Sequence, residues 1–177
     1  MRIAGIVPES SVDGPGIRFT VFTQGCLHHC PGCHNPGTWA LDGGREMTVS
    51  ALLDVLDRSD GIVSGVTVSG GEPLLQPDDV GRFLAGCKER RLHTVLFSGY
   101  VYEDALKLAG VRPLFDYVDL MVDGPFRQEL KNQELLFRGS SNQRLIDIPA
   151  TLAKGRVVEW KRFGYGLTAC MQMAISA

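Results

Sequence analysis

The chain has 177 residues, a length that suits one domain with an ordinary hydrophobic core. It is 44% hydrophobic and 21% charged, with a formal net charge of −2. This balance excludes a strongly basic nucleic-acid-binding domain, and no apolar run approaches the roughly 18 residues needed to cross a membrane. The first seven residues are too short and too polar for a signal peptide, so we expect a protein of the reducing cytoplasm.

The first predicted strand, residues 18–22, leads directly into a cysteine-rich loop. A helix follows, for which Ser50 is the expected N-cap. Leu52, Leu53 and Leu56 would form its apolar face, because they recur at helical spacing. The beginning of the chain therefore predicts a strand, a functional loop and a helix.

The middle of the chain continues to alternate strands and helices. Residues 65–69, 94–98 and 117–122 are short apolar runs typical of strands. Helices are expected to begin at Pro77 and to span residues 102–109. This alternation predicts an α/β fold with a mostly parallel sheet in a single domain. About four such strands are too few to close an eight-stranded barrel, so we expect an incomplete, partial β/α barrel.

The segments that follow these strands contain the residues with chemical potential. In parallel sheets the functional loops lie at the carboxyl ends of the strands, so the cysteine loop and residues 69–73, 98–100 and 123–125 should share one mouth. Asp123 is expected to face this mouth. Tyr100 could face it or pack against the core.

Three cysteines in the first loop are the most informative feature of the chain. Cys26, Cys30 and Cys33 have the spacing Cys-x3-Cys-x2-Cys, without a fourth cysteine nearby. Iron–sulfur clusters are held by cysteine thiolates, and a fully ligated [4Fe–4S] cluster takes four. Three thiolates would leave one iron open to bind a substrate. The spacing therefore predicts a cluster with chemical activity.

A structural zinc site is the main alternative reading of this loop. The three cysteines and one of His28, His29 or His34 would supply four ligands. All four would then fall within nine residues, without the distant second pair that is usual for such sites. A disulfide framework is less consistent with five cysteines, an odd number, in a chain without a secretory signal.

The remaining cysteines and two of the histidines are assigned no chemical role. Cys87 falls on the apolar face of a predicted helix and should behave as a small buried hydrophobe. Cys170 stays unassigned. His28 and His29 are expected to point into solvent rather than to bind metal.

The cysteine spacing, the ring residue His34 and the sequence Gly70-Gly-Glu72 at the end of the next strand together resemble the radical S-adenosylmethionine (SAM) superfamily. The resemblance is closer to the family of small glycyl-radical activases that serve anaerobic ribonucleoside-triphosphate reductase. Five segments carry it in order and spacing: Val12-Asp-Gly-Pro-Gly-Ile-Arg18, Pro31-Gly-Cys-His-Asn-Pro36, Ser98-Gly-Tyr100, Val122-Asp-Gly-Pro-Phe126 and Arg138-Gly-Ser-Ser-Asn-Gln143. The last of these narrows the superfamily to the reductase activases.

This resemblance implies a [4Fe–4S] cluster on Cys26, Cys30 and Cys33 and SAM as the second cofactor. The reduced cluster would split SAM and yield a 5′-deoxyadenosyl radical, which abstracts a hydrogen atom. No protein side chain is expected to be catalytic in its own right, because the cofactors perform the difficult step.

The same resemblance implies which residues bind SAM. Gly32 would let the loop wrap closely around the cluster, and His34 would lie beside the adenine. Gly70 and Gly71 would approach the methionine moiety with their backbone, and the carboxylate of Glu72 would lie near its ammonium group.

The implied partner is a large glycyl-radical reductase, on which the chain would generate a backbone glycyl radical. Arg138 and Asn142 would shape a loop or meet this partner. A reduced flavodoxin or ferredoxin is the implied electron donor. The resemblance ends near residue 148, and the unmatched extension at 148–177 motivates an alternative: a stand-alone radical SAM enzyme that acts on a small molecule or a peptide.

Overall fold

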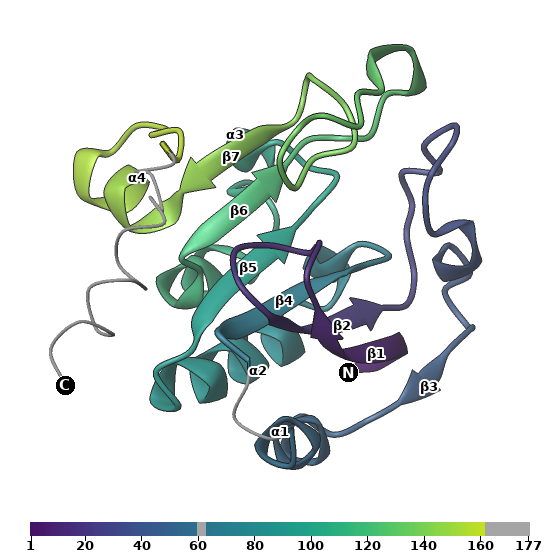
Figure 1. Ribbon diagram of the computed structural model, residues 1–177, viewed down its shortest axis with the longest axis vertical. Helices are drawn as coiled ribbons and strands as arrows, with labels where there is room; N and C mark the ends of the chain where they lie inside the picture. The colour runs from purple at the N-terminus through teal and green to yellow at the C-terminus, as the bar shows by residue number, and fades with distance from the viewer. Residues whose placement is uncertain (60–62, 162–177) are drawn as a thin grey trace, which may run out of the picture.

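The computed structural model describes residues 1–59 and 63–161, which build one open, seven-stranded sheet with helices around it (Figure 1). The strand order is β3-β1-β2-β4-β5-β6-β7. The strands are β1 (Arg2–Ser10), β2 (Arg18–Thr23), β3 (Arg45–Glu46), β4 (Gly65–Gly70), β5 (His93–Phe97), β6 (Leu120–Asp123) and β7 (Arg144–Asp147). The α-helices are α1 (Val49–Asp57), α2 (Pro77–Glu89), α3 (Tyr102–Ala105) and α4 (Ile148–Lys154). Short 3₁₀ turns occupy Pro36–Thr38, Pro73–Leu75, Arg112–Tyr117 and Gln128–Leu130.

The sheet is mixed rather than mostly parallel. The four central strands β2, β4, β5 and β6 run parallel to one another. The outer strands β3, β1 and β7 join by antiparallel pairing. The expectation of a mostly parallel sheet therefore describes the centre alone, because both edges are closed by strands that reverse the chain direction.

All four predicted strands exist in the centre of the sheet, and the three edge strands were not predicted. The predicted run 117–122 becomes a strand only from Leu120. The residues before it form a 3₁₀ turn that buries Leu114 and Phe115. Of the predicted run, Tyr117 ends this turn, and Val118 and Asp119 connect the turn to the strand.

The α-helices required two corrections. Helix α1 is capped by Thr48, whose hydroxyl accepts a hydrogen bond from Ala51 N at 3.1 Å, so the expectation for Ser50 was wrong. Ser50 instead pairs with the Thr48 hydroxyl. Helix α3 ends at Ala105, earlier than the predicted residue 109. Helix α2 begins at Pro77 as predicted.

The two faces of the sheet differ in what covers them. Val21, Val68 and Leu96 point into the hydrophobic core beneath α1 and α2. Because side chains alternate along a strand, Phe22 and Phe97 lie on the opposite face, where a cavity opens. Figure 1 shows α2 behind the sheet and the long loops gathered beyond the strand tips. This second face also carries a smaller hydrophobic cluster around Val95, Leu120 and Val122, so the cavity occupies only part of it.

The sequence-based extension at 148–177 begins with helix α4, and residues 162–177, including Cys170, lie outside the described part of the chain. Within the described part, every helix falls short of the length and apolar character that a membrane crossing requires.

Candidate active site

The carboxyl ends of the central strands meet around a single cavity of about 570 Å³. This volume falls in the range of small-molecule sites, about 300–1,000 Å³. Its walls come from the cysteine loop after β2, the turn at 69–71 after β4, residues 97–99 of β5 and its following turn, and the loop between β6 and β7. The predicted common mouth is therefore confirmed by geometry.

Backbone hydrogen bonds join the cysteine loop to the glycine turn. Gly71 N donates to Thr23 O at 2.8 Å, and Glu72 N donates to Gly25 O at 2.7 Å. A side chain at Gly71 would place its Cβ 2.3 Å from Gly25 O. Gly70 has φ +100°, and a Cβ there would lie 2.6 Å from Thr23 N. Glycine is required at both positions because two backbones come into contact there.

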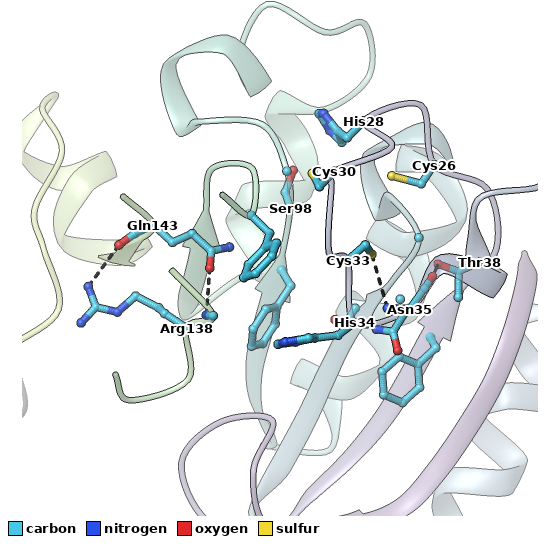
Figure 2. Close-up of a pocket in the computed structure, with 18 of the residues that line it drawn as sticks. Cys26, His28, Cys30, Cys33, His34, Asn35, Thr38, Ser98, Arg138 and Gln143 are labelled. Carbon is cyan, nitrogen blue, oxygen red and sulfur yellow. Dashed lines mark hydrogen bonds between the residues drawn. The ribbon is translucent and has the colours of Figure 1, made fainter. Parts of the chain in front are cut away.

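Cys26, Cys30 and Cys33 all line the cavity as free thiols (Figure 2). Cys26 is almost fully buried, whereas Cys30 and Cys33 are partly exposed. Cys33 Sγ accepts a hydrogen bond from Asn35 N at 3.3 Å. Gly25 N donates to Thr38 O, and Cys26 N donates to Trp39 O. These two hydrogen bonds join the beginning of the loop to its end. The fold thus presents three thiols from one short loop to the same space.

Burial raises the pKa of the Cys26 thiol, while hydrogen bonds from the backbone N–H groups of His28 and His29 act in the opposite direction. Burial also raises the pKa of Cys30, opposed by a backbone hydrogen bond from Phe126. These N–H groups stabilise negative charge on sulfur. A bound metal would favour the thiolate form of both residues much more strongly.

The donor set fits an iron–sulfur cluster. Cysteine thiolates hold such clusters, and each thiolate binds a separate iron atom. Cys26, Cys30 and Cys33 reach one cavity from a single short loop. In the described residues, groups of three or more His, Cys, Asp or Glu side chains positioned to hold one metal ion are absent.

Glu72 lies beside the cavity as a buried hydrogen-bond hub, with 1% of its side chain exposed. Oε1 accepts hydrogen bonds from Leu74 N at 3.0 Å and Ser98 Oγ at 2.9 Å. Oε2 accepts from Gly99 N at 2.8 Å and lies 3.0 Å from His28 Nε2. The two glycines before it line the cavity, but Glu72 itself does not.

The two histidines predicted to point into solvent differ. His29 is exposed, as expected, with its ring 4.9 Å from that of Trp39. His28 turns inward, lines the cavity and reaches Glu72, so its prediction was wrong. The sequence offers no local signal for this direction because the partner of His28 is 44 residues away.

His34 lines the cavity, and its ring lies 5.3 Å from the ring of Phe126. Both rings line the cavity and form an aromatic part of its wall. Gly32 adopts φ +73° on the outer side of the loop, where Gln128 Oε1 lies 2.9 Å from the position of an added Cβ. Gly32 therefore shapes the loop without lining the cavity.

Two residues at strand ends do not face the cavity. Asp123 is fully buried and pairs with Arg144, while its Oδ2 accepts a hydrogen bond from Tyr102 N at 2.7 Å. Tyr100 packs its ring against His28 with centroids 4.5 Å apart. The expectation that Asp123 faces the mouth was wrong, because the charge of Arg144 attracts its carboxylate away from it.

The loop between β6 and β7 forms the far wall of the cavity (Figure 2). Asn142 Nδ2 donates to Pro125 O at 2.8 Å and so shapes this loop, as predicted. Arg138 lines the cavity and donates through Nη1 to Gln143 O at 3.1 Å. Gln143 in turn accepts from Gly139 N at 2.9 Å. Gln143 also lines the cavity, which the sequence did not indicate.

Residues 12–146 match the family model of the 4Fe-4S single cluster domain. The anaerobic ribonucleoside-triphosphate reductase-activating protein of Salmonella typhimurium is 37% identical over 153 residues, which cover 81% of this chain and 96% of the relative. The protein of that name from Enterobacteria phage T4 is 34% identical over 150 residues, covering 82% and 93%. The pyruvate formate-lyase-activating enzyme of Clostridium pasteurianum is 48% identical over 117 residues, covering 60% of this chain and 48% of the relative.

Fold, thiol loop and cavity thus define a protein built to hold a single iron–sulfur cluster beside a small-molecule site. The chain belongs to the radical SAM family of glycyl-radical-enzyme activating proteins. Its cofactors are accordingly a [4Fe–4S] cluster and SAM.

Proposed function

We propose that the chain generates a glycyl radical on an anaerobic ribonucleoside-triphosphate reductase and that Cys26, Cys30 and Cys33 hold its cluster. The observation that carries this proposal is the convergence of the three thiols and the Gly70–Gly71 turn on one cavity. When bound, the cluster supplies the electron that splits SAM, and the resulting radical removes a hydrogen atom from the Cα of the partner's glycine.

The chain's own residues would bind and orient the cofactors. The turn at Gly70 and Gly71 offers backbone without Cβ for close contact with the methionine part of SAM. The buried carboxylate of Glu72 complements its positive ammonium group. The His34 ring, already beside Phe126, would contact the adenine, and Gly32 would let the loop close around the cluster.

The open sheet is, in this proposal, a partial barrel whose mouth the reductase covers. A protein substrate can exclude water from a site that a small molecule would leave open. A reduced flavodoxin or ferredoxin would supply the electron, and the cytoplasm is the compartment that keeps the thiols reduced.

A pyruvate formate-lyase is the second candidate partner, because one activating enzyme of that name shares 48% identity with this chain. The matched segment covers only 48% of that relative, against 96% of the reductase activase from Salmonella typhimurium. The segment from Arg138 to Gln143, which resembles the reductase activases, favours the reductase.

The test is to mix anaerobically reconstituted, reduced protein with SAM and either the reductase or a pyruvate formate-lyase. We expect a glycyl doublet in the electron paramagnetic resonance spectrum with the reductase, together with 5′-deoxyadenosine. A doublet with the lyase alone would assign the second partner. SAM-dependent turnover of a metabolite without any protein partner would support the stand-alone alternative instead.

A further inference from the structure

The contact between His28 and Glu72 joins two parts of the site that are far apart in sequence. In the sequence, His28 lies between Cys26 and Cys30, whereas Glu72 follows the two glycines of the turn after β4. Nε2 of His28 and Oε2 of Glu72 are 3.0 Å apart, and 20% of the His28 side chain is exposed. Because an ionised carboxylate can only accept, His28 must donate its Nε2–H.

The surroundings hold the ring of His28 in this position. A Cβ at Gly99 would lie 2.5 Å from Cδ2 of His28, so the ring packs directly on the turn that follows β5. Tyr100 contacts the ring edge-on at 4.5 Å between centroids. The absence of a side chain at Gly99 therefore creates the space that His28 fills.

The hydrogen bonds of Glu72 also limit what its carboxylate can do. Two oxygens offer about four acceptor sites. Four protein donors occupy them: Leu74 N, Ser98 Oγ, Gly99 N and His28 Nε2. These donors come from the cysteine loop, the glycine turn and the end of β5. Glu72 thus joins three loops of the site through hydrogen bonds to its carboxylate.

We propose that His28 is a positioning residue whose hydrogen bond to Glu72 fixes the cysteine loop relative to the glycine turn that receives SAM. The proposal rests on the proposed function, since it assigns the two loops to cluster and SAM. It assigns Glu72 a role through its protein contacts in addition to its charge. Without the bond, the cluster and the SAM-binding turn would lose their fixed separation.

The test compares two substitutions of the same kind in one loop. His28→Asn shortens the side chain so that it no longer reaches Glu72, and His29→Asn is the matched control at an exposed position that Asn tolerates with its positive φ of 48°. His28→Gln is the rescue variant, because it keeps an N–H donor at a similar reach. Each variant is reconstituted anaerobically and assayed for iron content, for SAM binding to the oxidised holoenzyme by calorimetry, and for the SAM-induced change in the spectrum of the reduced cluster.

We expect His28→Asn to keep the iron content of the wild type while its Kd for SAM rises about tenfold, as the loss of a hydrogen bond to a charged group predicts. Its SAM-induced spectral change should shrink, and His28→Gln should restore both within about threefold. His29→Asn should match the wild type throughout.

Three results would overturn the proposal: wild-type SAM binding and spectrum in His28→Asn, loss of iron in His28→Asn alone, or failure of His28→Gln to rescue. The second would make His28 a metal ligand, and the third would make it a packing residue. A wild-type protein that holds no cluster or leaves SAM intact would reject the proposed function itself, before any variant is compared.

Gly99→Ala gives an independent check with His28 unchanged, because the new methyl group would displace the ring. The variant should weaken SAM binding, and adding His28→Asn to it should weaken binding no further. Additive losses would show that the two residues act separately and would contradict the proposal.

Discussion

Two buried carboxylates lie near the carboxyl ends of β4 and β6, on either side of β5, and their partners differ. Asp123, fully buried, pairs with Arg144, which also binds Glu103. The hydrogen bonds that Arg144 donates to the carboxylates of Asp123 and Glu103 raise the pKa of Arg144 above its ordinary value. Glu72, equally buried, is held by a hydroxyl, two backbone N–H groups and an imidazole.

The difference separates a carboxylate paired with a guanidinium from one that we propose attracts the ammonium group of SAM. The charge of Asp123 is neutralised by a guanidinium, so little of its field extends beyond the pair. None of the hydrogen-bond donors to Glu72 in the described chain comes from Arg or Lys, so its negative charge stays beside the cavity. That charge can attract a cation such as the ammonium group of SAM. Four predictions test this division, from the largest expected effect to the smallest.

Replacing one of the three cysteines that line the cavity should abolish cluster binding and SAM cleavage. Cys30→Ala removes one cluster ligand, so we expect iron content to fall severely and SAM cleavage to drop by at least about 100-fold. Cys87→Ala is the control, because Cys87 is fully buried on the core face of α2 and burial raises its pKa to about 12. Normal iron content in Cys30→Ala would remove this thiol from the site.

Asp123→Asn should weaken the scaffold and leave the ligand site unchanged. Arg144 would lose its buried partner but keep Glu103, so we expect the free energy of unfolding to fall by about 2–3 kcal/mol. Urea denaturation measures this loss. SAM affinity should stay within about twofold, and a larger loss of affinity with normal stability would reverse our assignment of Asp123.

Glu72→Gln should have the opposite effect to Asp123→Asn, with a large loss of SAM affinity and a smaller loss of stability. The substitution removes the negative charge beside the cavity, so we expect the Kd for SAM to rise about tenfold or more. Stability should fall by about 1–2 kcal/mol, less than for Asp123→Asn, because the amide can still accept through one oxygen. Calorimetric titration and urea denaturation of the two variants side by side decide the comparison.

A third carboxylate, Asp119, lies before β6 at the opposite end of that strand and should make stability depend on pH without changing the ligand site. Burial acts to raise its pKa, but hydrogen bonds from Lys88 and from Thr94 N outweigh burial and lower it. A lowered pKa means that this contribution is present above the unfolded value of about 3.9 and is lost as pH falls through the folded value. The wild type should therefore exceed Asp119→Asn in stability above about pH 5. This advantage should shrink as pH falls through the lowered pKa of Asp119, which urea unfolding across the acid range measures.

Much of the scaffold could be predicted from local patterns. The central strands are short apolar runs, and α2 starts at a proline with acidic residues behind it, signals that depend on neighbouring residues alone. Strand β1 was not predicted because seven of its nine residues are partly or fully exposed, without a regular alternation of buried and exposed positions. Strand β7 has only four residues, and its pairing partner β6 is needed to define it.

The candidate site shows the same division. The sequence was enough to identify Cys26, Cys30 and Cys33 and the two glycines of the next turn. Each group lies within one short loop, so its members stay close together in any fold. The sequence could not predict that His28 points toward the cavity or that Asp123 pairs with Arg144. Each depends on a partner more than twenty residues away.

The amino-acid sequence by itself thus determined the chemistry of this protein: three thiols in a short loop, two glycines where backbone must approach, and the central parallel strands that carry them. Only the tertiary structure decided the edges of the sheet, the capping of α1 by Thr48 and the partners of each buried charge. The physical reason is that a spacing along the chain limits local geometry, whereas the direction of a polar side chain is set by whichever distant donor or acceptor removes it from water at the lowest cost.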